Sequence, residues 1–379
     1  MVVTAATLVA ADGLTDLMRR MKDYCCYLGD DLEEKLFHSG TDIHAVGHKG
    51  RTALHYAARK NYDSEMISLL LKNGADVEAE DILGRTPLIA AVHKGRVAAA
   101  RALLDGGAAV DKRDSANMSA LMHAVERDHV ECVRLLLQRG ATVDLKGPEG
   151  ATALALAACK NSLECAMVLI EHGANVNAKD MDGARPLMFA AQFASIELIN
   201  ALLQHGADIK ATSKDGDTVL KFAAERGESD GKKVQVLKLL LDNGAPVNMK
   251  RNCSLASPLI CAAEHGNIEC VRLLLARGAD VNVDMEEDYT ALMMAAWYGR
   301  TEVVQALLEA GADAEASNCD DKTALMLAVE GDHVECAHAL LKHGCNVHVV
   351  DSDRKTALIL AIENNAVKCV QLLEQHLVA

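Results

Sequence analysis

The sequence predicts an all-α protein built from many copies of one helical unit, and three observations lead to this fold class. Aromatic residues make up only 3% of the 379 residues, so a β-sandwich or barrel would lack the side chains that pleated surfaces favour. Apolar residues make up 50% of the chain, which is enough for an extended core. A seven-residue motif also recurs at a nearly fixed spacing, as in repeat architectures.

The recurring motif occurs ten times along the chain. Its copies are TALHYAA, TPLIAAV, SALMHAV, TALALAA, RPLMFAA, TVLKFAA, SPLICAA, TALMMAA, TALMLAV and TALILAI, which begin at residues 52, 86, 119, 152, 185, 218, 257, 290, 323 and 356. Successive copies start 33 residues apart, except for offsets of 34 after residue 52 and 39 after residue 218. Such spacing predicts one array of stacked structural repeats.

Each repeat carries the signals for two helices and a turn. The Thr or Ser that opens most copies of the motif is a preferred helix N-cap, and the small Ala residues after it allow close packing. The second helix, for example HVECVRLLLQRG from His129, has apolar residues at helical spacing and ends at a Gly. A polar segment such as NAKDMDGA, just before Arg185, supplies the residues of a protruding hairpin.

This pattern resembles the ankyrin repeat, whose signatures are T-P-L-H-x-A and a closing phrase such as the NGADV that follows Lys72. The resemblance covers residues 40–379. It implies an α-solenoid, a curved stack of ten helix–turn–helix repeats with short β-hairpin loops. It also implies that a protein or peptide partner binds the concave face, which hairpin tips and the exposed ends of the first helices form.

Three segments depart from the family pattern. The His of the motif is kept only at His55, so we expect apolar packing to replace the family's capping hydrogen bond in most repeats. Five extra residues, near 228–233, separate the helices of the repeat that begins at Thr218. We expect a solvated turn there, with a second docking site as the alternative. Residues 1–39 are expected to form a degenerate N-terminal capping repeat with an inserted helix near 31–37.

Charge and cysteine content limit the partners and the compartment. A formal net charge of −15 argues against a general affinity for nucleic acid or anionic membranes. The sequence contains no apolar stretch near the roughly 20 residues that a membrane helix needs, so no membrane insertion is expected. The apolar start of the chain lacks the basic segment of a signal peptide. We therefore expect reduced thiols and a cytoplasmic location, with the nucleus as an alternative.

Cysteine and histidine do not form a convincing chemical site in the sequence. Five cysteines share the position 13 residues after the start of the motif, where other repeats carry Met, Ala, Leu or Val: Cys132, Cys165, Cys270, Cys336 and Cys369. We therefore expect buried apolar side chains there. The phrase HVEC occurs twice, but a structural zinc site needs four ligands. With no recognisable phosphate loop or nucleophile motif either, we expect no metal, no cofactor and no catalysis.

One covalent modification follows from the resemblance alone. In this family the Asn of a Leu-x₅-[Asp/Glu]-Val-Asn segment can be hydroxylated, and Asn282 fits, with Leu274 eight residues and Asp280 two residues before it. The alternative is that Asn simply tolerates the turn conformation at this position.

The resemblance also suggests which residues a partner would contact. The variable positions of the concave face are cationic in the first repeats, at Arg51, Lys60, Arg85 and Lys94, and acidic in the last three, for example at Glu286 and Glu287. Aromatic residues occupy these positions at Tyr289, Trp297 and Tyr298 of one repeat, and at Phe193 of an earlier one. Because Trp and Tyr dominate interface hot spots, we expect an anchor at Trp297 and Tyr298 for a partner carrying Lys or Arg. The alternatives are ordinary solvated charges and a Trp that only shields the next repeat.

The sequence therefore favours a monomeric, non-catalytic scaffold for protein–protein interaction. Two further functions stay open: a regulatory or targeting subunit that presents clients to a kinase, phosphatase or ubiquitin ligase, and a structural linker to cytoskeletal or membrane proteins. Fold alone does not separate these three functions.

Overall fold

The computed structural model describes residues 42–60, 64–225, 230–248 and 257–378. The chain divides into two compact units, Met1–Met181 and Asp182–Ala379. The whole of the expected capping segment, 1–39, with its inserted helix, lies outside the described residues. The described residues contain twenty α-helices and no extended sheet, so the predicted all-α fold class is confirmed.

The helices of the first unit come in four pairs. They are α3 (Ala53–Arg59), α4 (Ser64–Lys72), α5 (Pro87–Val92), α6 (Val97–Asp105), α7 (Ala120–Glu126), α8 (Val130–Gln138), α9 (Ala153–Lys160) and α10 (Leu163–Glu171). The short turns η1 (His48–Gly50) and η2 (Pro148–Gly150) form hairpin tips before α3 and α9.

The second unit continues with six pairs. They are α11 (Pro186–Gln192), α12 (Ile196–Gln204), α13 (Val219–Ala224), α14 (Asp230–Asp242), α15 (Pro258–His265), α16 (Ile268–Ala276), α17 (Ala291–Trp297), α18 (Thr301–Glu309), α19 (Ala324–Glu330), α20 (Val334–Lys342), α21 (Ala357–Glu363) and α22 (Val367–Val378). The turn η3 (Glu286–Asp288) precedes α17.

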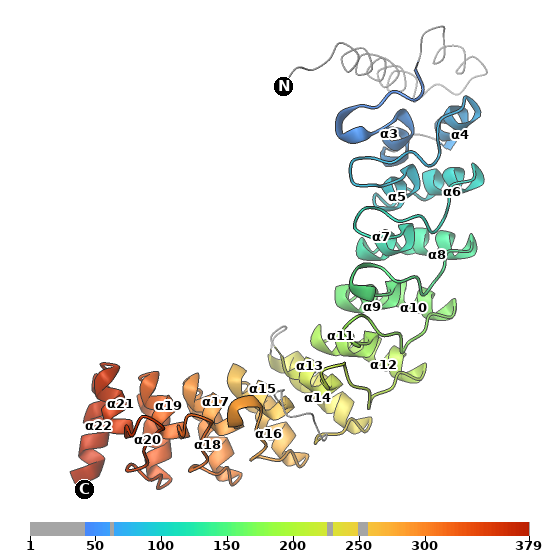
Figure 1. Cartoon of the computed structure of the whole chain (residues 1–379). Helices are drawn as coiled ribbons and strands as arrows, with labels where there is room; N and C mark the ends of the chain where they lie inside the picture. The colour runs from blue at the N-terminus through green and yellow to red at the C-terminus, as the bar shows by residue number, and fades with distance from the viewer. Residues whose placement is uncertain (1–41, 61–63, 226–229, 249–256, 379) are drawn as a thin grey trace, which may run out of the picture. The chain divides into compact units, whose positions relative to one another are not determined.

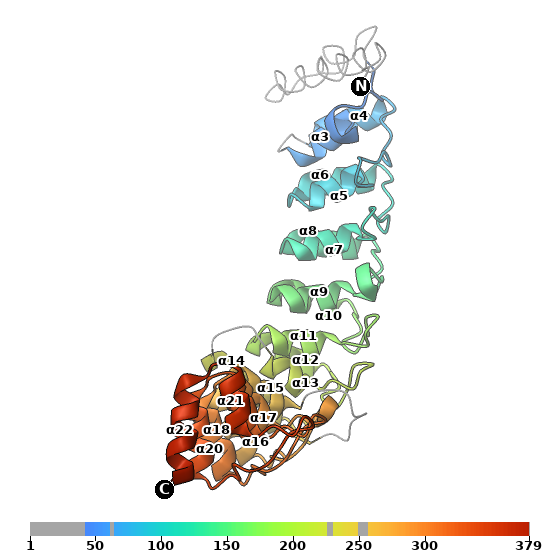
Figure 2. The ribbon, with the colours of Figure 1, turned by 60° about the vertical axis from the view of Figure 1, so that its left-hand side comes forward.

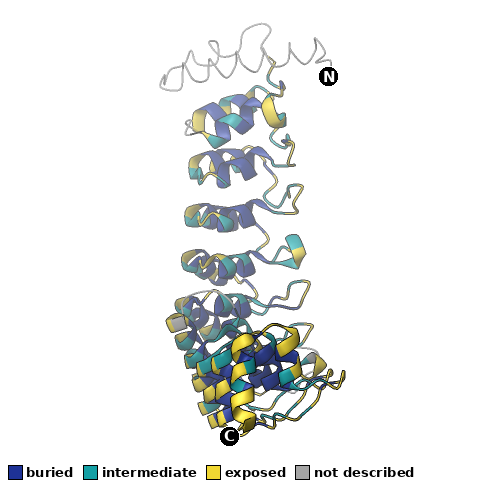
Figure 3. Ribbon diagram, turned by 90° about the vertical axis from the view of Figure 1, so that its left-hand side faces the viewer, coloured by how far each residue is buried: buried dark blue, intermediate teal, exposed yellow. Residues whose placement is uncertain are grey.

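Within each unit the first helices of the pairs stack on one another, and so do the second helices. In the first unit α5 packs against α3 and α7, and α6 packs against α4 and α8 (Figure 1). In the second unit α17 packs against α15 and α19, while α18 packs against α16 and α20 (Figure 1). Figure 2 shows the stacked pairs of the first unit from another side. Figure 3 shows the buried residues inside these rows and the exposed residues at helix ends and hairpins. Each repeat is therefore stabilised mainly by its neighbours.

The first helices begin at the side chains that the sequence predicts. Thr86 Oγ1 accepts a hydrogen bond from the Ile89 backbone N–H at 3.3 Å, and Ser257 Oγ accepts one from Ile260 at 3.1 Å. This N-cap bond satisfies one of the backbone donors left free in the first turn. Arg185, the one motif start without a hydroxyl, makes no side-chain cap and relies on Pro186 in the first turn.

The second helices end as predicted, at a Gly in the left-handed region. These glycines have φ between 82° and 93°: Gly74, Gly107, Gly140, Gly173, Gly206, Gly244, Gly278, Gly311 and Gly344. A side chain is unfavourable at such φ values, which explains the recurring Gly.

The hairpins join neighbouring repeats through backbone hydrogen bonds. The Ile82 N–H donates to the Lys49 carbonyl at 3.1 Å, and the Cys319 N–H donates to the Glu287 carbonyl at 3.1 Å. Only isolated antiparallel bridges, such as Asp284 with Thr290, are found in the described hairpins. The hairpins therefore act as connectors between repeats rather than as a continuous sheet.

His55, which keeps the histidine of the family motif, and the apolar residues that replace it in other repeats behave as expected. His55 Nδ1 lies 3.3 Å from the Thr52 backbone N and 3.0 Å from Thr52 Oγ1, while Nε2 donates to the Arg85 carbonyl at 2.8 Å. His55 thus caps its own helix and links two repeats. At the same position Met122 and Met293 are only 1% exposed, so apolar packing replaces the hydrogen bonds there.

The extra residues near 228–233 were expected to form a solvated turn, and for residues 230–233 this prediction is wrong. Residues 226–229 lie outside the description, but Asp230–Lys233 form the first turn of α14, which has 13 residues where most second helices have 9. Lys233 is only 6% exposed and lies three and four residues before Val236 and Leu237, which are fully buried. Its aliphatic stem extends their buried stripe by one helical turn.

The recurring cysteines are core residues, as predicted. Cys132, Cys165, Cys270, Cys336 and Cys369 are all fully buried. Burial raises the pKa of the Cys132 thiol to about 11, so it stays protonated at neutral pH. Among the described helices, none combines the length and apolar character required to cross a bilayer.

Candidate partner-binding surfaces

Three aromatic side chains of one repeat form an exposed patch in the second unit. We call Tyr289, Trp297 and Tyr298 the aromatic patch. Trp297 is the last residue of α17 and Tyr298 caps it, and they are 44% and 43% exposed. The rings of Tyr289 and Trp297 meet edge to face with centroids 6.0 Å apart. Tyr289, which is half-buried, thus packs against a tryptophan that stays open to solvent.

A histidine of the next repeat holds the backbone under the aromatic patch. His333 Nε2 donates to the Trp297 carbonyl at 2.9 Å. The ring lies close to Gly299 and Gly331, where an added Cβ would come within 2.6 Å and 2.5 Å of it. Any side chain at these glycines would therefore push His333 away from Trp297. This packing explains the His of the second HVEC phrase without a metal.

Carboxylates of two hairpin tips accompany the aromatic patch, and those of Glu287 and Asp320 lie within electrostatic reach of Tyr289. Glu287 and Asp288 precede Tyr289, and Asp320 and Asp321 occupy the next hairpin; all four are exposed, and we call them the acidic rim. None of the four takes part in an ion pair among the described residues. Burial raises the pKa of Tyr289, and the carboxylates of Asp320 and Glu287 add to the effect. Glu286 begins η3, but its side chain lies outside the described part of the structure.

The acidic residues further along the second unit are less available than the sequence suggests. Lys322 Nζ lies 2.7 Å from Glu330 Oε1, and Lys355 Nζ lies 2.8 Å from Glu363 Oε2. Each pair joins the residue before the N-cap of a first helix to the last residue of that helix. The acidic excess near α17 therefore comes from the hairpin tips.

Two of the four cations predicted to bind a partner have structural partners instead. Arg51 Nε and Arg85 NH2 lie 3.4 Å and 3.1 Å from Asp81 Oδ2, and their side chains are 12% and 17% exposed. Asp81 Oδ1 also accepts hydrogen bonds from the backbone N–H groups of Leu83 and Arg85. Arg51 and Arg85 thus stabilise a hairpin, and this role could not be read from the repeat pattern.

The other two predicted cations, Lys60 and Lys94, belong to a row that continues with two further cations. Lys60, Lys94, Arg127 and Lys160 occupy equivalent positions at the ends of α3, α5, α7 and α9, and all four are exposed. No ion pair involves any of them among the described residues. We call these residues the cation row. Equal spacing in the sequence, at the second position after the motif's Ala pair, was the signal that could have identified Arg127 and Lys160.

Two other candidate residues belong to neither the aromatic patch nor the cation row. Phe193 caps α11 and is 41% exposed, but it belongs to a repeat three positions before the aromatic patch. Asn282 is exposed, and its Oδ1 accepts a hydrogen bond from the Asp313 backbone N–H at 2.8 Å. The side chain therefore connects two repeats, and its hydroxylation stays a prediction.

Comparison with known proteins places the chain in a family. Family models described as "Ankyrin repeats (3 copies)" match residues 23–114, 107–180, 229–318 and 292–377, and one described as "Ankyrin repeats (many copies)" matches residues 169–223. The chain is an ankyrin-repeat protein. Stacked repeats of this class present extended surfaces for protein–protein interaction.

Two curated relatives share a short segment with the chain. Protein phosphatase 1 regulatory subunit 12A from Mus musculus and that from Rattus norvegicus are each 49% identical over 55 residues. The segment is 14% of this chain and 5% of each relative, so the chain spans only a small part of their length. Since 55 residues amount to fewer than two repeats of this array, the similarity is one between individual repeats.

Proposed function

We propose that this protein is a non-catalytic scaffold that binds partner proteins through the exposed ends of its first helices and the adjoining hairpins. The observation that carries the proposal is the aromatic patch, because the chain has one tryptophan and places it 44% exposed beside Tyr289 and Tyr298. Exposed aromatic clusters of this kind are typical of interface hot spots.

The acidic rim indicates the chemistry of the partner at this surface. Its four carboxylates are exposed and without ion pairs among the described residues, so a cationic segment would neutralise them at little desolvation cost. An Arg or Lys side chain could also lie over the ring of Trp297. The partner of the second unit is therefore proposed to present Lys or Arg next to an apolar side chain.

The cation row suggests a different partner chemistry for the first unit. Lys60, Lys94, Arg127 and Lys160 repeat once per helix pair, so an extended acidic segment could place one carboxylate on each repeat. The row is locally positive although the whole chain has a net charge of −15. An acidic segment of a partner protein is therefore the ligand proposed for this unit.

A second candidate function is a regulatory or targeting subunit. The similarity to protein phosphatase 1 regulatory subunit 12A favours this function over the structural linker, although it covers only 55 residues. It is tested by measuring whether complexes captured with this chain carry phosphatase activity above that captured with an unrelated ankyrin-repeat protein.

The main proposal is tested by quantitative affinity capture followed by mass spectrometry. The full chain is compared with the double variant Trp297→Ala/Tyr298→Ala and with the control Val367→Ala, which removes a 60% exposed apolar side chain elsewhere in the second unit. We expect a set of proteins to be lost with the double variant and kept with the control. Thermal unfolding is measured for all three chains, and equal capture by all three would contradict the aromatic patch as the binding centre.

A further inference from the structure

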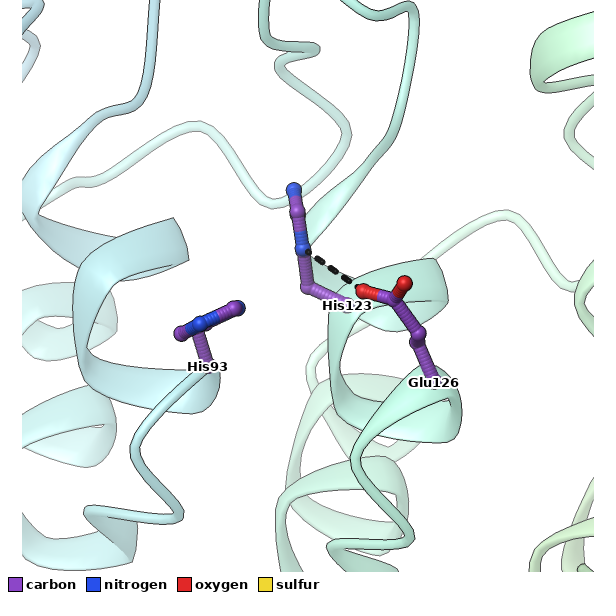
Figure 4. A group of neighbouring side chains, drawn as sticks. All are labelled: His93, His123 and Glu126. Atoms are coloured by element: carbon purple, nitrogen blue, oxygen red, sulfur yellow. Dashed lines mark ion pairs between the residues drawn. The ribbon is translucent and has the colours of Figure 1, made fainter. Parts of the chain in front are cut away.

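Three potential metal-ligating side chains converge between two neighbouring helices of the first unit. His93 lies at the end of α5, and His123 and Glu126 lie on α7 (Figure 4). One nitrogen or oxygen atom from each of the three lies within 4.8 Å of those of the other two. The repeat pattern does not predict this cluster, because the two histidines occupy different positions of their repeats.

Hydrogen bonding within the cluster leaves acceptor atoms of His123 and Glu126 facing each other. His123 Nε2 lies 2.8 Å from Asp114 Oδ2, and since a carboxylate only accepts, Nε2 donates and carries the proton. In the neutral ring Nδ1 then has a free lone pair, and Glu126 Oε2 lies 3.7 Å from it. His123 is 5% exposed, and its Nδ1 has no hydrogen-bond partner. Only a proton or a metal cation between them would make this arrangement favourable.

His93 supplies a second nitrogen without a partner. Its Nδ1 is buried and lacks a hydrogen-bond partner, and its ring meets that of His123 edge to face with centroids 5.4 Å apart. An imidazole nitrogen without a hydrogen-bond partner can offer its lone pair to a metal when the ring is neutral.

We propose that His93, His123 and Glu126 bind a divalent transition-metal ion such as Zn²⁺ and thereby link two adjacent repeats. Two imidazoles and one carboxylate form a donor set that suits Zn²⁺ with one position left open. Tetrahedral ligands at zinc lie about 3.4 Å apart, so the donors need to close by no more than about 1.4 Å, which side-chain rotation supplies. Asp114 orients His123 from behind, as metal-bound histidines usually require.

The surrounding charges set the strength and the role of the site. Lys94 and Arg127 are exposed next to it and would weaken the binding of a cation, so we expect a lower affinity than in a closed four-ligand zinc site. The open fourth position would hold a water molecule. Because its ligands come from two repeats, the metal would stabilise the contact between α5 and α7.

The proposal is tested with Co²⁺ and Zn²⁺ on the full-length reduced chain after chelation. We expect the absorption bands of tetrahedral Co²⁺ without thiolate charge-transfer bands, and displacement of Co²⁺ by Zn²⁺. His93→Gln and Glu126→Gln should each weaken metal binding at least tenfold. Asp114→Asn should weaken metal binding about tenfold. Glu131→Gln is the control, because Glu131 is exposed on the adjacent α8 and pairs only loosely with Arg134.

A second readout separates metal binding from folding. Zn²⁺ should raise the Tm of the wild-type chain and of Glu131→Gln but not that of His93→Gln or Glu126→Gln, since a ligand stabilises only the state that binds it. Metal-free Tm values and far-UV circular dichroism show whether each variant folds. Absence of tetrahedral Co²⁺ binding by the wild type, or thiolate bands that persist unchanged in the two variants, would overturn the proposal. The latter result would place the metal on cysteines.

Discussion

The two units end their first helices with different chemistry. In Met1–Met181 the equivalent end positions carry Lys60, Lys94, Arg127 and Lys160, whereas in Asp182–Ala379 the described ones carry Phe193, His265, Tyr298, Gly331 and Asn364. The backbone and the core of the repeats are alike in both units. The repeat motif therefore determines the scaffold, while single variable positions determine the surface chemistry of each unit.

The units also differ in how repeats are joined beneath these surfaces. In the first unit His55 donates to the Arg85 carbonyl of the next repeat, and Asp81 pairs with Arg51 and Arg85. In the second unit Met293 fills the position of His55, and the neutral Asn318 occupies that of Asp81. Polar contacts at the junction of His55 and Asp81 thus correspond to apolar or uncharged contacts at the junction of Met293 and Asn318, and this predicts different responses of the two junctions to mutation and pH.

The largest effect is expected for His55→Met, which introduces the apolar residue found at Met293. The Arg85 carbonyl and the Thr52 N–H lose their buried partner, so we expect a loss of about 2–3 kcal/mol. Because repeat arrays open locally, the loss is measured by hydrogen exchange of the α3 and α5 amides. The matched control Met293→Leu should cost less than about 1.5 kcal/mol. Equal costs for the two variants would contradict the comparison.

An intermediate effect is expected for Asp81→Asn, which introduces the residue found at Asn318. Burial alone would raise the pKa of Asp81, but hydrogen bonds from the Leu83 and Arg85 backbone and the Arg85 side chain outweigh it and hold the pKa below 3.8. The variant keeps an amide oxygen for the backbone bonds but loses both ion pairs. We expect a cost of about 1–2 kcal/mol at pH 7.

The same carboxylate makes the first unit sensitive to acid. Since the pKa of Asp81 is lower in the folded than in the unfolded chain, the unfolded chain binds more protons in acid. The stabilisation is complete above the ordinary value of 3.8 and is lost as the pH falls below it. Hydrogen exchange at pH 7 and below pH 4 should show a smaller acid loss in Asp81→Asn than in the wild type. An identical acid loss would show that Asp81 does not carry the effect.

The smallest effect is expected for single neutral substitutions in the cation row. Lys94→Gln removes one exposed charge, so its binding to a poly-glutamate peptide should weaken roughly two- to fivefold at low salt and less at high salt. The control Lys112→Gln removes a cation of the same unit that already pairs with Glu80 at 2.8 Å. Fluorescence anisotropy measures both affinities, and equal weakening by both variants would indicate nonspecific attraction rather than a row.

The features that recur in every repeat could be predicted from the sequence. The Thr86 cap, the buried Cys132 and the Gly140 after α8 all follow from a local pattern with a single physical reason. The helix that begins at Asp230 could not be predicted, because Lys233 is buried through its aliphatic stem in a polar segment. Tertiary packing outweighed the local turn signals there.

The surfaces could be predicted only in part. The proximity of Tyr289 and Trp297 follows from their repeat positions, so the sequence indicates it. The partners of Arg51 and Arg85 at Asp81 depend on side-chain directions across a hairpin. The approach of His93 to His123 depends on packing between two repeats, and no spacing rule reports it.

The most direct test of partner binding at the aromatic patch uses the fluorescence emission of Trp297, the chain's only tryptophan. A protein that the full chain captures and the double variant does not is purified, and a segment of it that lacks tryptophan is titrated into the full chain. The excitation wavelength is chosen so that tyrosine does not absorb. We expect a saturable blue shift or quenching, because the partner covers a ring that is 44% exposed in the free chain, and we expect weaker binding at high salt. Saturable binding with unchanged Trp297 emission would contradict this prediction, since the partner would then bind elsewhere.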